Sequence, residues 1–419
     1  MKISDFTYLL VSSILLLSFW NITPIVSIFN RDTIFLLSMV WLIIGLYLPQ
    51  KKSKLPTKFF KKYNWIWICI FLGIFISMCN AYLFGGQNIL TTFIAQRFTY
   101  TFILIPTLIK IQPSSSCIIR VLKVLSYITL TTWIISIINP NLIATISEDT
   151  INRKESTENT DIGYYVTGIN IVVFYTYFLI QEYIKKFNYK KFFIAIFWIT
   201  FIILYQNRSM LLGVIIIFLY SLTKLKSRYK PIIIISICLF ICIFLNYTWN
   251  IWLSLIEESQ NQLADDDYNR WKALDYYLNH YSPNLWCYLL GNGMPSGGNS
   301  ILGNLYWQNM SKGIFISDIG MVGMWVNYGI ISIFSIYYII IKILTLKKFP
   351  LWIKFMSFHI LIVPTIFTFG NGNGILLFSL LIYSYIYYSK LPYIQQKHKL
   401  YEQYACSYYN KLQERTTNN

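Results

Sequence analysis

Long apolar runs separated by short polar connections dominate this chain. A run of roughly 18 or more apolar residues matches the ~30 Å core of a bilayer, because a helix rises ~1.5 Å per residue and satisfies its own backbone. The pattern predicts an all-α polytopic membrane protein with about 12 transmembrane helices. The predicted spans are 6–29, 33–49, 63–84, 91–110, 118–138, 164–181, 191–206, 208–223, 231–249, 319–342, 351–368 and 373–389.

Composition agrees with this interpretation. The 419 residues are 56% hydrophobic and only 12% charged, with a mean hydropathy of +0.50, whereas about a quarter of the residues in a soluble domain are charged. We therefore expect a single integral membrane domain over 1–419, without a separate soluble domain. Its largest polar pieces are a loop at 250–318 and a tail at 390–419.

Basic residues predict the orientation. The connections 50–62, 182–191, 223–231 and 342–354 are rich in Lys, as is the tail at 390–419, and together they hold most of the 35 Lys and Arg. Lys and Arg stay on the cytoplasmic side of a membrane. Both termini are therefore expected in the cytoplasm, and the net charge of +18 calls for no nucleic acid. The basic residues expected on the outer side are Arg31, Arg153, Lys154, Arg208, Arg270, Lys272 and Lys312.

The loop 250–318, expected on the outer side between spans nine and ten, carries two features. Near 265–281, Trp271, Leu274, Leu278 and Tyr281 recur at helical spacing, which predicts an amphipathic helix on the membrane surface or over a cavity. It is followed by LLGNGMPSGGNS, whose Gly and Pro exclude regular structure. Such a loop can present backbone N–H groups to an anion, although most glycine-rich segments are only turns.

Two groups of short motifs lie on the expected outer side. Arg208-Ser209 lies at an outer helix junction, and the outer loop carries Arg270-Trp271, then Gly291-Asn292-Gly293, then Ser317-Asp318-Ile319-Gly320. In their order and their side of the membrane, these motifs resemble those of the O-antigen polymerase and O-antigen ligase superfamily of bacterial membrane glycosyltransferases. Ligases of this superfamily place a His-Asn near the end of that loop. This chain has none there, since its histidines are His280, His359 and His398, which favours polymerase over ligase.

The resemblance implies a reaction at the outer face of the bacterial cytoplasmic membrane. Oligosaccharide units on polyprenyl diphosphate would be joined into O-antigen or capsular polysaccharide. The donor is already activated, so neither a metal nor a cofactor is expected. The partners it implies are the lipid-linked oligosaccharide and membrane lipid. A chain-length regulator and a flippase are further candidate partners.

Arginine suits a diphosphate leaving group, because its planar fork binds phosphate oxygens and stays charged. The resemblance assigns catalytic roles to Arg208, Arg270 and Asp318, with Asp318 as candidate base for the acceptor hydroxyl. The substrate-binding candidates are Arg97, Trp271, His280, Gly291 and Gly293.

Each residue also has a structural interpretation. Arg208 could be a solvated arginine at a helix junction, and Arg270 could pair with Asp266 or Asp267 in its own helix. Asp318 could cap the following helix, and His280 could be a surface residue. Arg97, inside a span, could bind backbone carbonyls, although a charge there suggests function.

A transporter or flippase for lipid-linked oligosaccharides is the alternative from another functional class. Transporters are often built from two similar halves around a midplane site. This chain shows no such halves, and its outer loop at 250–318 is long. Both features favour an enzyme that acts at the outer face.

Overall fold

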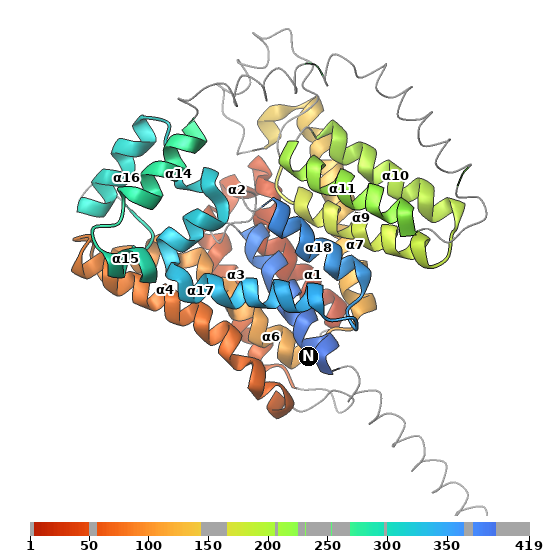
Figure 1. The fold of residues 1–419 in the computed structure, drawn as a ribbon, viewed down its shortest axis with the longest axis horizontal. Helices are drawn as coiled ribbons and strands as arrows, with labels where there is room; N and C mark the ends of the chain where they lie inside the picture. The colour runs from red at the N-terminus through yellow and green to blue at the C-terminus, as the bar shows by residue number, and fades with distance from the viewer. Residues whose placement is uncertain are drawn as a thin grey trace, which may run out of the picture.

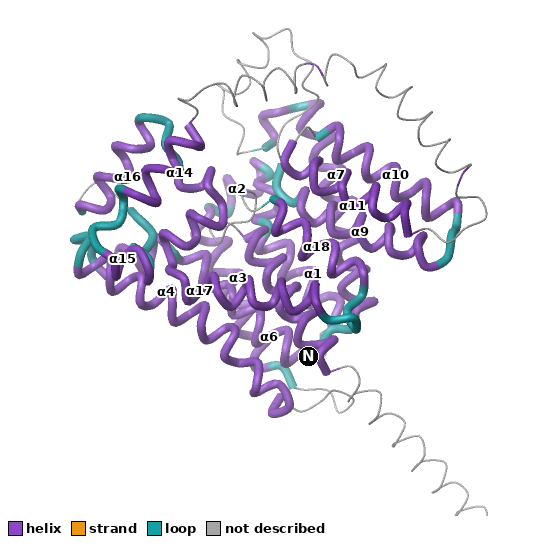
Figure 2. The backbone as a smooth tube through the Cα atoms, viewed as in Figure 1, coloured by secondary structure: helices purple, strands orange, loops and turns teal. Residues whose placement is uncertain are grey.

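The computed structural model describes residues 4–49, 57–143, 166–205, 208–224, 269–296, 300–363 and 372–390, together with Pro231 and Leu253. Within these ranges the chain is helix or loop (Figure 2), and the pairing of Ile22 with Ile143 is an isolated bridge. The predicted all-α class is confirmed. Apart from Pro231, the predicted span 231–249 lies outside the described residues.

The described helices follow the apolar runs of the sequence. Residues 372–390 are helical as well. In chain order the others are α1 (Asp5–Leu16), η1 (Ser18–Asn21), α2 (Thr23–Ile28), α3 (Arg31–Tyr47), η2 (Thr57–Tyr63), α4 (Asn64–Leu83), α5 (Ile89–Ala95), η3 (Arg97–Ile103), α6 (Leu104–Ile111), α7 (Ser115–Ile138), η4 (Pro140–Leu142), α9 (Ile169–Lys185), α10 (Tyr189–Leu204), α11 (Arg208–Lys224), α14 (Asn269–Asn279), α15 (Leu285–Leu290), α16 (Ile301–Ser311), η5 (Ile316–Ile319), α17 (Gly320–Thr345) and α18 (Leu351–Ile362).

The helices form three groups (Figure 1). α4 and α17 run side by side near α3 and α6, while α7, α9, α10 and α11 form a second group on the right. α18 contacts both groups through α17 and α9. The third group, at the upper left, is made by α14, α15 and α16 of the predicted outer loop, and it lies away from the N-terminus at the bottom.

Small residues bring α4 and α17 together. A Cβ on Gly73 would overlap the Ser332 hydroxyl, and that hydroxyl donates to the Ile70 carbonyl at 3.2 Å. Close approach at small residues, with hydroxyl bonds across the contact, is how helices associate in lipid.

α9 is the centre of the second group. Nearly all of its residues are buried, which is typical of a helix that is apolar on every side. Its Tyr177 hydroxyl lies 2.6 Å from Nδ1 of His359 on α18. Gly213 of α11 leaves room for this imidazole, because a Cβ there would overlap it.

The described helices include three that are long and apolar enough to cross a membrane: Phe60–Leu83, Ser115–Ile138 and Gly320–Thr345. A fourth exists if Ile89–Ala95 and Arg97–Ile111, bent by 67°, form one span. The predicted count of about 12 is not reached among the described residues. Several apolar runs are divided by breaks or give helices shorter than a bilayer requires.

Candidate functional site

A glycine-rich loop enters a break in α17. Gly329 has φ 75°, which interrupts the helix, and the backbone of Gly291 and Gly293 fills the gap with φ of 90° and 77°. The N–H groups of Asn292 and Gly293 donate to the carbonyls of Val326 and Asn327, at 2.8 and 2.9 Å. A Cβ at Gly291 would collide with the α17 backbone, so glycine is required here.

Buried amide side chains fasten this loop to α4 and α5. Asn80 donates to the Gly291 carbonyl at 2.8 Å. Gln87, which is 1% exposed, donates to the Met294 carbonyl at 2.8 Å and accepts from the Ser296 N–H at 2.8 Å. The segment 291–296 is therefore fixed to α4 and to the turn between α4 and α5.

This arrangement changes the interpretation of the loop. The N–H of Gly291 donates to the Cys287 carbonyl at 2.9 Å, so all three amides from Gly291 to Gly293 are used within the protein. The expected presentation of these N–H groups to an anion is not what this geometry provides. A substrate-binding role for Gly291 and Gly293 remains a prediction, and the role visible in the structure is packing.

α14 bears Arg270 and Trp271 at its start. The predicted helix near 265–281 is described from Asn269 to Asn279, and 265–268 lie outside the described residues. Ala273, Tyr277 and Tyr281 are buried and pack against η5 and α17. Of the predicted apolar face, Tyr281 is therefore buried, whereas Trp271 is 54% exposed.

The remaining candidates of the outer loop lie around α14. Arg270 is exposed. His280 is exposed as well, with Nε2 3.7 Å from the Asp275 carboxylate, which matches a surface histidine. Asp318 lies in η5, which contacts α14, so the backbone brings Asp318 and Arg270 onto neighbouring elements. The Asp318 side chain lies outside the described part of the structure.

Arg208 begins α11, and its side chain also lies outside the described part. α11 contacts α9, α10 and α18, on the right of Figure 1, whereas α14 lies on the left. The described contacts therefore place Arg208 and Arg270 on different helix groups.

A second helix break carries Arg97. α5 and η3 meet at Gln96 and Arg97, in the pair bent by 67°. Nη2 of Arg97 lies 2.7 Å from Oδ1 of Asp32 on α3, and Nη1 donates to the Ile94 carbonyl at 3.0 Å. Arg97 Nε and Gln96 Oε1 are buried and have no hydrogen-bond partner among the described residues. Two buried polar atoms at this break therefore lack a described hydrogen-bond partner.

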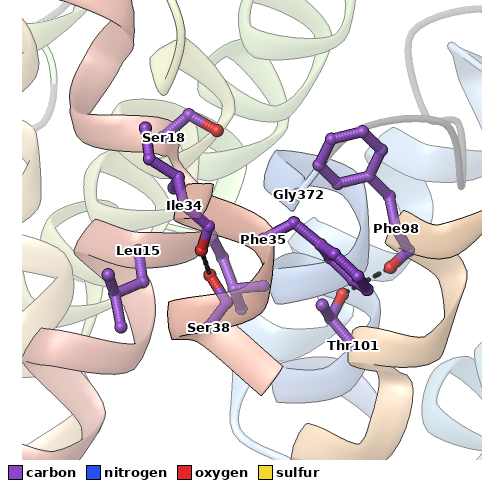
Figure 3. A pocket seen from close by; sticks show the side chains of 9 residues that line it. Leu15, Ser18, Ile34, Phe35, Ser38, Phe98, Thr101 and Gly372 are labelled. Atoms are coloured by element: carbon purple, nitrogen blue, oxygen red, sulfur yellow. Dashed lines mark hydrogen bonds between the residues drawn. The ribbon is translucent and has the colours of Figure 1, made fainter. Parts of the chain in front are cut away.

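A small pocket adjoins the second break (Figure 3). It is lined by Leu15, Leu16, Ser18, Ile34, Phe35, Ser38, Phe98, Thr101 and Gly372. Its volume of about 10 Å³ has room for roughly one water molecule. Ser38 and Thr101 donate to the carbonyls of Ile34 and Phe98, so its walls are mainly apolar. Asp32 lies one helical turn before Phe35, and Arg97 directly precedes Phe98, so the ion pair lies close to the pocket.

η1, which contributes Ser18 to the pocket, has an unusual backbone. Ser18, Phe19, Trp20 and Asn21 have φ between 49° and 57°, a left-handed conformation that costs ~1–2 kcal/mol per residue outside glycine. Two side-chain bonds hold it: Trp20 Nε1 donates to Thr129 at 3.0 Å, and Asn21 Nδ2 donates to Thr167 at 3.2 Å. Such strained backbone is concentrated at functional sites.

Sequence reasoning missed Asp32, Asn80 and Gln87. Each is a single polar residue whose partner is distant in sequence, so no local pattern identifies it. For Asp32, the sequence offered one indication: it is an acidic residue on the expected outer side. Within the described residues, no group of three or more His, Cys, Asp or Glu could hold a metal ion.

Comparisons of the chain with family models, with curated proteins and with solved structures find no match.

Proposed function

We propose that this chain is a membrane glycosyltransferase that polymerises polyprenyl-diphosphate-linked oligosaccharide units at the outer face of the cytoplasmic membrane. The observation that carries the proposal is Arg97, a cation fixed at a break between helices. A charge within an apolar segment is costly and indicates function. Next to a bilayer, a guanidinium suits the diphosphate that leaves when the glycosidic bond to the carrier breaks.

Helix lengths support a site in the outer half of the membrane. In the proposed topology the N-terminus is cytoplasmic and about 12 spans follow. α2 and α5 then separate the breaks at η1 and Arg97 from the outer surface. Their lengths of 6 and 7 residues correspond to about 10 Å each. This depth suits a donor whose lipid lies in the outer leaflet.

The outer loop supplies the other proposed groups. Arg270 on α14 would bind the donor or acceptor from outside, and Asp318 on the adjoining η5 would accept the proton of the acceptor hydroxyl. Arg208 would contribute a further cation from the start of α11. The packing of Ala273 and Tyr277 against η5 and α17 supports this proposal, because it holds α14 beside the element that carries Asp318.

A flippase is the second candidate, and interrupted helices favour it. Transporters bind substrates at discontinuous helices, but near the midplane and with access from both sides. The breaks here lie nearer one end of their helices. The polymerase therefore remains the function that the geometry supports best.

The test is polymer length in cells lacking the native gene and expressing variants at equal levels. Arg270→Ala should leave single or few repeat units outside the cell, as should Arg208→Ala. Lys272→Ala, two residues from Arg270 on the exposed face of α14, is the matched control and should give full-length polymer. Full-length polymer in both arginine variants would exclude the proposed roles. Single units accumulating on the cytoplasmic face would instead identify a flippase, and polymer left on its carrier would identify a ligase.

A further inference from the structure

The protein holds the Arg97 side chain on several sides. Nη1 donates to the Ile94 carbonyl, and Cζ lies 5.2 Å from the centre of the Phe98 ring. Nη2 contacts the Asp32 carboxylate. The first two contacts belong to the same helix pair as Arg97, while Asp32 comes from α3. The Asp32 side chain is 66% exposed, against 27% for Arg97.

The contact with Asp32 is the one that an incoming anion can replace. Exposed ion pairs are weak, because water screens the charges and the side chains lose freedom on pairing. If Asp32 moves away, Ile94 and Phe98 still hold the guanidinium in place. Its Nη2 is then free, and arginine binds phosphate with parallel N–H bonds.

The position of Asp32 also suits an anion. Asp32 lies in the first turn of α3, and Asn30 caps this helix by accepting from the Thr33 N–H at 2.8 Å. The positive end of the helix dipole stabilises a carboxylate there. The same field would stabilise a phosphate that replaced it.

We propose that Asp32 is an intramolecular competitor that occupies Arg97 until the diphosphate of the lipid-linked donor displaces it. The identity of this ligand rests on the proposed function. A carboxylate carries one negative charge and a diphosphate carries more, so the donor displaces Asp32 while a singly charged headgroup competes poorly. Asp32 is thus a specificity-determining residue, acting through Arg97.

The test uses the purified full-length protein in nanodiscs of zwitterionic lipid, with farnesyl diphosphate as the probe. Asp32→Asn should tighten the Kd of the probe about fivefold, the scale of an exposed ion pair. The gain should shrink as salt is added. Asp275→Asn is the matched control, because its side chain is also 66% exposed, and it should change the Kd less than about twofold.

A double-mutant cycle separates competition from a general charge effect. Arg97→Gln should weaken binding of the probe. In that background Asp32→Asn should leave the Kd unchanged, because Asp32 then has no arginine to pair with. An unchanged Kd in Asp32→Asn, or an equal gain with and without Arg97, would overturn the proposal. If phosphatidylglycerol in the nanodisc removes the gain, the site binds any anionic headgroup and the assignment to the donor fails. A similar gain with inorganic pyrophosphate supports recognition of the diphosphate itself.

Polymer formation measured in parallel keeps the two proposals apart. Loss of polymer in Arg97→Gln without tighter binding in Asp32→Asn rejects the competitor and keeps the polymerase. Tighter binding in Asp32→Asn with normal polymer in Arg97→Gln keeps the anion site and rejects its role in polymerisation.

Discussion

Two broken helices contact α4, and different groups occupy the two breaks. At Gly329 the break in α17 is filled by the backbone from Gly291 to Gly293, whose amides all have acceptors. At the junction of α5 and η3 the break holds Arg97, whose Nε has no described partner and whose counter-ion is exposed. The first break is closed by backbone and the second by a replaceable side chain.

This difference separates an architectural break from a candidate site. At the first break the backbone amides from Gly291 to Gly293 all have acceptors, although Asn327 Oδ1 and Trp325 Nε1 of α17 are buried without a described partner, and the break holds the segment 291–296 in place. The second break differs in holding a cation, Arg97, whose partner Asp32 is 66% exposed, with a small pocket beside it. A charge within an apolar segment is costly, which indicates a use beyond stability.

The largest expected effect is at the first break. Gly329→Ala should destabilise the protein by about 3 kcal/mol or more, because φ 75° is unfavourable for alanine and its Cβ would overlap the Leu290 backbone. Gly86→Ala is the matched control. It also has a positive φ, of 60°, but its Cβ would meet nothing nearer than 3.7 Å, so only about 1 kcal/mol should be lost. Unfolding of the purified proteins in detergent measures both, and equal losses would show that the insertion is not tightly packed.

The next effect concerns the side chain that anchors the loop. Gln87→Leu removes the side chain that bonds the Met294 carbonyl and the Ser296 N–H, and leaving these part-buried groups without a partner should cost about 1 kcal/mol. Gln308→Leu, at an exposed position on α16, should be nearly neutral. Protection of the 291–296 amides in hydrogen exchange gives a local readout. Unchanged protection in Gln87→Leu would mean that the loop is held without this side chain.

Sequence patterns predicted the bounds of the longest helices well. The ranges 63–84, 118–138 and 319–342 correspond closely to α4, α7 and α17, because long, mainly apolar runs leave few alternatives to a helix. The break at Gly329 within α17 was not predicted. The break at η1 was not predicted, since Leu-Ser-Phe-Trp-Asn contains no Gly or Pro. It depends on contacts with Thr129 and Thr167 that are distant in sequence.

The residues of the candidate site likewise differ in whether the sequence could predict them. Arg97 could be identified because a charge inside an apolar run is visible locally. Its partner Asp32 could not, since their pairing depends on how α3 packs beside η3. On the predicted apolar face of α14, Tyr281 is buried and Trp271 is 54% exposed, because helical spacing does not reveal which residues find neighbours within the protein.

A smaller effect is expected at the second break when charge is kept and geometry is lost. Arg97→Lys should reduce polymer formation about tenfold, because lysine keeps the charge but has no planar fork for a diphosphate. Stability should change by less than about 1 kcal/mol, since the pair with Asp32 is exposed. Repeat-unit number on gels, normalised to protein level, is the measurement. Wild-type polymer length in Arg97→Lys would show that charge alone is sufficient there.

The smallest expected effect is a difference in how readily a thiol reagent reaches the two breaks. Burial raises the pKa of the Cys287 thiol from 9.0 to about 11, so at pH 7.4 its reactive thiolate is about 100-fold rarer than in an ordinary cysteine. With Cys287 as the sole cysteine, a membrane-impermeant maleimide should leave intact cells unlabelled. Asp32→Cys in a cysteine-free background should react, because this position is exposed on the proposed outer side. Lys185→Cys, exposed near the proposed cytoplasmic end of α9, should react only after permeabilisation. Labelling of Cys287 at neutral pH would show that the first break opens to solvent, and the contrast between the two breaks would fail.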